Sequence, residues 1–256
     1  MLLVVLAILP SIIIGMFIYQ NDQVEKEPKK EIVKALLMGG LSVVFTLLLS
    51  WILGMFKIEF KNLNVIETIA YAFIGVALIE EFSKWICTTL FIMKNKNYNY
   101  LFDGIVYAVF VSLGFATIEN ILYVLTGDFI VAIMRAIATV PSHAFDAIFM
   151  GYFLSKSKQA KIHKHKKNQR KYFVYSLFIP VLLHGIFDSL LLLGNIMTLS
   201  IFLGFVIFLY VISIRTVNKS KQEECAFEVR KKLYCPDCGT KLIGKYCTNC
   251  GLKVEE

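Results

Sequence analysis

The sequence is poor in charged residues and lacks two common local motifs of soluble hydrolases. Asp, Glu, Lys and Arg make up 18% of its 256 residues, whereas about 25% is usual in soluble chains. Hydrophobic residues make up 57%, and the mean hydropathy is +0.65. The sequence contains no HExxH segment of a helical zinc protease and no GxSxG segment of a serine hydrolase. These shortages exclude an ordinary soluble domain and both of those hydrolase patterns.

The N-terminus lacks the features of a cleaved signal peptide. The segment MLLVVLAILP is apolar from its second residue, with no positive region and no small-residue cleavage site. We therefore expect an uncleaved first membrane helix. The chain also shows no internal repeat, whereas transporter folds often contain such repeats.

Long apolar stretches predict an all-α polytopic membrane protein with about seven transmembrane helices. A spanning helix needs about 20 mostly apolar residues. The stretches that meet this requirement lie at 2–19, 32–56, 65–93, 103–126, 128–154, 172–194 and 196–214.

The basic residues of the loops predict the orientation. The segments 20–34, 94–100 and 155–171 together carry fourteen Lys and Arg residues, and the loops that alternate with them carry two. Because cytoplasmic loops are rich in Lys and Arg, we expect the N-terminus outside and the C-terminus in the cytoplasm of a multi-pass protein of the cell membrane. We interpret the basic loop, with His163 and His165, as a topology signal that contacts anionic lipid. We do not expect nucleic acid as a partner.

The third predicted helix carries an unusual pair of carboxylates, Glu80 and Glu81. Charges within membrane helices are costly and usually functional. Lys84 follows at i+4 and i+3, within reach of either carboxylate. A self-neutralising ion pair would explain Lys84 and one glutamate, but it leaves the other unexplained.

Further polar residues lie on the next three predicted helices. Single histidines in apolar helices are more often satisfied core residues than ligands, but several such residues on successive helices favour one polar site. They are Phe115 and Glu119, His143 and Asp146, and His184 and Asp188.

This set of residues suits hydrolysis. Hydrolysis needs an activated water, a base and donors for the oxyanion. A metal would supply two of these, and imidazole with carboxylate suits zinc. The sequence leaves open whether a divalent metal, additional to the C-terminal zinc described below, acts there or a glutamate activates water alone.

The motifs EExxK at Glu80–Lys84, FxxxE at Phe115–Glu119 and HxxxD at His184–Asp188 resemble the PrsW family of intramembrane proteases, distant relatives of the CAAX prenyl proteases. The resemblance covers roughly residues 1–214. It implies a glutamate-dependent endopeptidase in which Glu80 and Glu81 are the essential pair.

The resemblance further implies that Glu119, His143, His184 and Asp188 bind a metal or orient water and oxyanion, with support from Lys84 and Phe115. The implied substrates are membrane-anchored proteins with a short extracytoplasmic part, including anti-sigma factors of stress responses. The alternatives are a proton- or cation-coupled transporter or channel, and a non-enzymatic scaffold.

The C-terminus carries a cysteine pattern typical of a zinc ribbon. Two CxxC knuckles are separated by eight residues, and four thiolates close a structural zinc site. The ligands are Cys235, Cys238, Cys247 and Cys250. Two disulfides are disfavoured by the predicted cytoplasmic location.

These patterns predict three parts: a transmembrane protease domain at 1–214, a connector at 215–232 and the zinc ribbon at 233–256. Few basic or aromatic residues accompany the knuckles, so we expect the ribbon to contact a protein partner.

Overall fold

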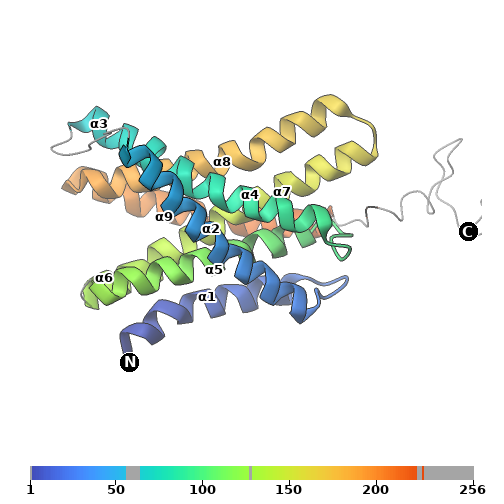
Figure 1. The fold of residues 1–256 in the computed structure, drawn as a ribbon, viewed down its shortest axis with the longest axis horizontal. Helices are drawn as coiled ribbons and strands as arrows, with labels where there is room; N and C mark the ends of the chain where they lie inside the picture. Colours follow the sequence, from blue (N-terminus) through green and yellow to red (C-terminus); the bar gives the residue numbers. More distant parts are fainter. Residues whose placement is uncertain (1, 56–63, 127–128, 224–226, 228–256) are drawn as a thin grey trace, which may run out of the picture.

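The structure is a computed structural model that describes residues 2–55, 64–126, 129–223 and 227. The predicted zinc ribbon, with its four cysteines, lies outside these residues. The described residues form a bundle of long helices that run roughly along one axis (Figure 1). These helices are α1 (Leu2–Asn21), α2 (Lys29–Met55), α3 (Val65–Ala70), η1 (Tyr71–Ala77), α4 (Leu78–Lys94), α5 (Asp103–Thr126), α6 (Phe129–Met134), η2 (Arg135–Thr139), α7 (Val140–Ile162), α8 (Lys166–Leu193) and α9 (Ile196–Gln222).

Two of the long helical stretches contain a π-helical segment. The segment η1 joins α3 to α4 without a break in the helix, and η2 joins α6 to α7 in the same way. The N–H of Leu78 donates to the carbonyl of Phe73, and the N–H of Val140 donates to that of Arg135. These are i to i+5 bonds, which admit one extra residue per turn and change the direction of the side chains beside them.

Five helices of the described part are long and apolar enough to cross a membrane. They lie at Lys29–Gly54, Asp103–Leu125, Phe129–Ile162, Lys166–Leu193 and Ile196–Gln222. The shorter apolar helix Val5–Asn21 and the α3–η1–α4 stretch are not among them. The all-helical membrane fold is confirmed, and the predicted number of seven spans stays a prediction.

Several helices extend beyond the predicted boundaries on their polar sides. The stretch 155–171, predicted as a loop, is helical except around His163–His165, and α9 continues to Gln222, well into the predicted connector. Hydropathy marks where a helix leaves apolar surroundings. Lys, Arg and Gln are good helix formers and prolong it into water.

The core of the bundle is centred on α5. Val106, Val109 and Val111 are completely buried. Gly39 of α2 and Gly114 of α5 let these two backbones touch, because a Cβ on either would overlap a carbonyl oxygen of the other helix. Small residues allow such close crossings where helices pack in lipid.

A second glycine crossing holds α5 against α7. A Cβ on Gly151 would overlap the carbonyl oxygen of Gly104, and one on Gly104 would meet the Ser155 hydroxyl. Backbone contact on two sides therefore fixes the position of α5 between α2 and α7.

The ends of α1, α4, α7 and α9 lie at the same end of the bundle (Figure 1). There Tyr107 of α5 donates a hydrogen bond to Glu27, which is 3% exposed. Burial, opposed by that hydrogen bond, raises the pKa of Glu27 to about 7.

The Phe227 ring packs edge-on against Tyr98 at 5.3 Å, with the Lys158 ammonium over both rings. This end of the bundle carries the three basic segments of the sequence.

Candidate active site

Glu80 and Glu81 lie in the first turn of α4, just after η1, and have different surroundings. The Glu81 side chain is 1% exposed, and its Oε1 accepts a hydrogen bond from Lys84 Nζ at 2.5 Å. The Glu80 side chain is 12% exposed, and its Oε2 lies 3.7 Å from the same nitrogen. One carboxylate is therefore held by a hydrogen bond, and its neighbour makes only a longer ion-pair contact with the same lysine.

His184 of α8 lies among carboxylates from three helices. Its Nδ1 is 2.8 Å from Glu81 Oε1, and its Nε2 is 3.4 Å from Asp188 Oδ2, one turn further along α8. The same Nε2 lies 3.9 Å from Glu80 Oε2. Because Glu81 engages Nδ1, the ring directs Nε2 toward Glu80 and Asp188.

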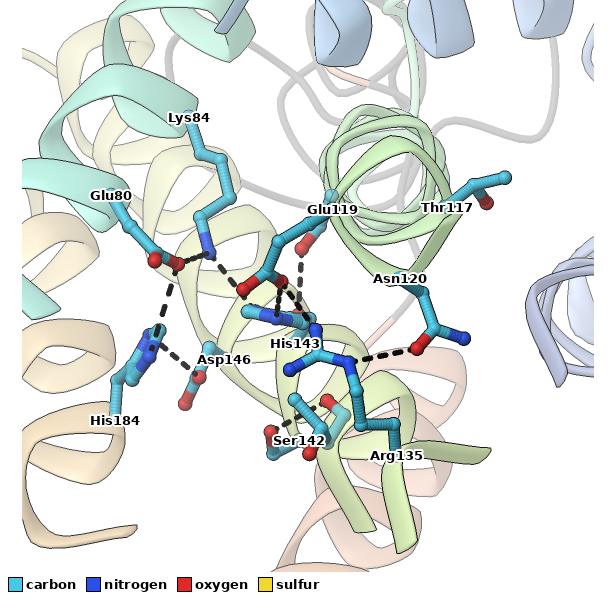
Figure 2. A network of polar contacts seen from close by, with 12 residues as sticks. Glu80, Lys84, Thr117, Glu119, Asn120, Arg135, Ser142, His143, Asp146 and His184 are labelled. Atoms are coloured by element: carbon cyan, nitrogen blue, oxygen red, sulfur yellow. Dashed lines mark hydrogen bonds and ion pairs between the residues drawn. The ribbon is translucent and has the colours of Figure 1, made fainter. Parts of the chain in front are cut away.

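His143 of α7 links Lys84 to Glu119 of α5 (Figure 2). Its Nδ1 lies 3.2 Å from Lys84 Nζ, and its Nε2 lies 2.9 Å from Glu119 Oε2. An ammonium group can only donate, so Nδ1 is the acceptor and Nε2 carries the proton that Glu119 accepts. The geometry thus assigns a neutral tautomer to His143.

Phe115 covers this link from one side. Its ring meets His143 edge-on with centroids 5.7 Å apart, and the Lys84 ammonium lies 4.5 Å from its centroid. This is a cation–π contact in a buried place, where such contacts are strongest. The phenyl ring therefore stabilises a buried cation while excluding water from it.

Asp146 lies one turn after His143 and also belongs to the network. Its Oδ2 lies 3.8 Å from His184 Nδ1. The side chain is fully enclosed, and neither of its oxygens has a hydrogen-bond partner in the described part of the chain. The sequence pointed to Asp146 as a polar residue of this helix but did not assign it a role in the site.

Sequence reasoning missed Arg135 and Asn120. Arg135 Nη2 lies 3.0 Å from Glu119 Oε2, and its Nε donates to Asn120 Oδ1 at 2.8 Å (Figure 2). Arg135 stands in an apolar stretch, so the same rule that singled out Glu80 could have found it. Asn120 carries no comparable signal, because an uncharged amide is a weaker anomaly.

The site contains more acidic than basic groups. Permanent positive charge comes from Lys84 and Arg135, whereas five carboxyl groups surround them. These are Glu80, Glu81, Glu119, Asp146 and Asp188. Such an excess of buried negative charge requires protons, a charged histidine or a bound cation, because isolated charges are costly to bury.

The donors fit a divalent metal. One ligand atom from each of Glu81, His143, Asp146 and His184 lies within 4.8 Å of the others. Two imidazoles and two carboxylates suit zinc or a similar ion. Glu81 Oε2 and both Asp146 oxygens are buried and have no hydrogen-bond partner among the described residues, as expected of atoms that await a ligand. A second set, Glu80, Glu119 and His143, meets the same distance limit.

All the membrane residues that the sequence singled out therefore lie in one network, contributed by α4, α5, α7 and α8. Their individual roles stay predictions. Cys87 of α4 is buried with a free thiol and is not part of any of these contacts.

Comparison with known proteins gives consistent matches. The sequence profile described as "PrsW family intramembrane metalloprotease" matches residues 27–214. A protein named Protease PrsW from Clostridioides difficile (strain 630) is 35% identical over 222 residues, which cover 85% of this chain and 90% of that protein. A Protease PrsW from Geobacillus kaustophilus (strain HTA426) is 37% identical, covering 72% of this chain and 76% of that protein.

A Protease PrsW from Bacillus subtilis (strain 168) is 30% identical over 84% of this chain and 93% of that protein. No solved structure gives a significant match.

Proposed function

The chain belongs to the PrsW family of intramembrane metalloproteases, and we propose that Glu80 is the general base with which it hydrolyses a peptide bond within the bilayer. One observation supports this assignment above the others. Glu81 Oε1 is held at hydrogen-bond distance by Lys84 and His184, whereas Glu80 approaches the same two groups only at 3.7 and 3.9 Å, and its side chain is the more exposed of the two. A general base must not be committed to a close partner of its own if it is to accept a proton from water.

In the proposed reaction Glu80 takes a proton from water, whose oxygen attacks the scissile carbonyl carbon. The proton then passes to the leaving nitrogen as the carbon–nitrogen bond breaks. His184 Nε2 lies near Glu80 Oε2 and can donate to the developing oxyanion or to that nitrogen. Glu81 and Asp188 orient the imidazole from both sides.

Glu81, His143, Asp146 and His184 would hold the metal that the family description implies. A bound divalent ion would activate water and polarise the carbonyl. Both ring nitrogens of His143 are engaged by Lys84 and Glu119, and those of His184 face Glu81 and Asp188, so each imidazole would have to release one partner to become a ligand.

The substrate is a membrane-anchored protein. We propose that it has a short extracytoplasmic part, as the family resemblance implies for anti-sigma factors, and that the N-terminus of the protease lies outside. The four C-terminal cysteines would bind a structural zinc in the cytoplasm and present the ribbon to a protein partner.

Co-expression tests the proposed base directly. The protein is produced with a panel of epitope-tagged single-span membrane proteins, and cleavage products are followed by immunoblotting. Glu80→Gln and His184→Ala should each lower cleavage at least about 100-fold, because each removes a group that acts in the reaction. Glu31→Gln, which changes a residue of the exposed Lys34–Glu31 pair on α2, is the matched control. Unchanged cleavage by inserted Glu80→Gln protein would exclude Glu80 as the base.

A further inference from the structure

We propose that Arg135 is a positioning residue that holds the Glu119 carboxylate against His143. The three groups form a chain from the start of η2 to the middle of the site, with Nη2 of Arg135 at 3.0 Å and Nε2 of His143 at 2.9 Å from the same oxygen, Glu119 Oε2. Arg135 is not among the residues that the motifs of the sequence pick out.

The Arg135 guanidinium, in ion-pair contact, and the His143 imidazole, in a hydrogen bond, converge on one oxygen and hold the carboxylate between them. The Glu119 side chain is 17% exposed, so water cannot replace either donor fully. Without Arg135, Glu119 would keep only the neutral imidazole as a direct partner, and its carboxylate would be free to turn away from the ring. His143 would then lose the acceptor that sets its tautomer, and Lys84 would lose the acceptor nitrogen on the other side of the ring.

Besides its contact with Glu119, Arg135 is held by two further side chains. Its Nε donates to Asn120 Oδ1, and its guanidinium carbon lies 4.0 Å from the centre of the Tyr123 ring. Asn120 is fully buried and donates in turn to the carbonyl of Ala7 on α1. Arg135 is therefore a rigid cation that joins α1 to the site, although the family profile begins only at residue 27.

The planar fork of Arg reaches two acceptors at once, and a Lys at this position would supply only a point charge. Loss of charge and loss of geometry should therefore have separate effects. Arg135→Gln removes both, whereas Arg135→Lys removes only the geometry.

The test uses purified protein in proteoliposomes with the reporter substrate found by co-expression. For Arg135→Gln we expect kcat to fall about 10- to 100-fold, as is typical when a residue supporting a site is lost, with KM changed less than about threefold. A residue that only stabilised the fold would instead lower the amount of inserted protein without this separation of kcat from KM. Arg135→Lys should recover part of the lost kcat, because it restores the charge without the planar fork.

Arg215→Gln on α9 is the matched control, because it removes an exposed arginine from another helix. An Arg135→Gln enzyme with the wild-type kcat, or one whose KM rises as much as its kcat falls, would overturn the proposal. If Arg135→Gln does not insert, Arg135→Lys decides: an unaltered kcat refutes the positioning role.

The inference relies on the proposed function for its assay. Cleavage by Glu80→Gln at the wild-type rate would refute the proposed base, whatever the Arg135 variants do, so the two failures are distinguishable.

Discussion

Replacing Lys84 by Met should destabilise the protein more than any surface substitution. The Lys84 side chain is 1% exposed, and its ammonium is 2.5 Å from Glu81 Oε1, whose side chain is equally buried. Removing one partner of a buried pair leaves the other charge uncompensated, which costs about 3–5 kcal/mol. For a chain of this size, that corresponds to a fall in Tm on the order of 10 °C.

Thermal unfolding in detergent, followed by tryptophan fluorescence, measures this effect. Trp85 is adjacent to Lys84 and donates to the Ser176 hydroxyl of α8, so its emission reports on the α4–α8 contact. The double variant Glu81→Gln/Lys84→Met should recover at least half of the loss, because a neutral amide replaces the unpaired carboxylate.

The matched control is Lys34→Met. Lys34 also contacts a glutamate at 2.6 Å, but its side chain is 47% exposed, so the change should cost less than about 1 kcal/mol. A Lys84→Met protein whose Tm lies within about 2 °C of the wild type would refute the reasoning. So would a double variant no more stable than Lys84→Met.

Three further predictions concern other parts of the chain. The pKa of Glu27 is raised to about 7, so the folded state holds a proton that the unfolded state releases near pH 4.5; stability should therefore fall between about pH 4.5 and 7 and stay low above it. Glu27→Gln should flatten this dependence of Tm on pH, and an unchanged slope would contradict the assignment. Gly151→Val should lower Tm by several degrees, because its side chain would push against the carbonyl of Gly104, whereas Gly54→Val, in open space, should not. Elemental analysis should show one zinc per chain more in the wild type than in Cys235→Ser, and an equal zinc content in the two proteins would contradict a Cys₄ site.

The helices and the polar residues of the site could be predicted because each leaves a local signal. The predicted helix at 65–93 agrees with the continuous helical stretch from Val65 to Lys94, although this stretch is not among the five candidate membrane spans. Glu80, Glu119, His143 and His184 stood out because polar groups are rare in such surroundings. The i, i+4 spacing of His184 and Asp188 was enough to place both on one face.

Other features depend on contacts between helices and could not be predicted. Nothing in the sequences of η1 and η2 indicates a π-helical turn. Because a π-helical turn rotates the residues that follow it, the direction in which Glu80 points around the helix axis cannot be derived from the sequence. The difference between Glu80 and Glu81 also arises only when α8 brings His184 to one of them. The helix ends of α7 and α9 were placed too early because hydropathy reports the surroundings of a helix rather than its length.

The glycine crossings on both sides of α5 limit the route by which a substrate reaches the site. Backbones in direct contact have no side chains between them that could rotate aside, so α2, α5 and α7 cannot part without separating as whole helices. The interface between α8 and α9 is different, because it is formed by side chains such as Phe187 and Phe202, whose ring centroids are 4.9 Å apart. Side chains in a packed interior can change rotamer without separation of the backbones. A lateral opening toward the lipid should therefore need the least backbone movement at the α8–α9 interface, where Phe187 lies three residues along α8 from His184.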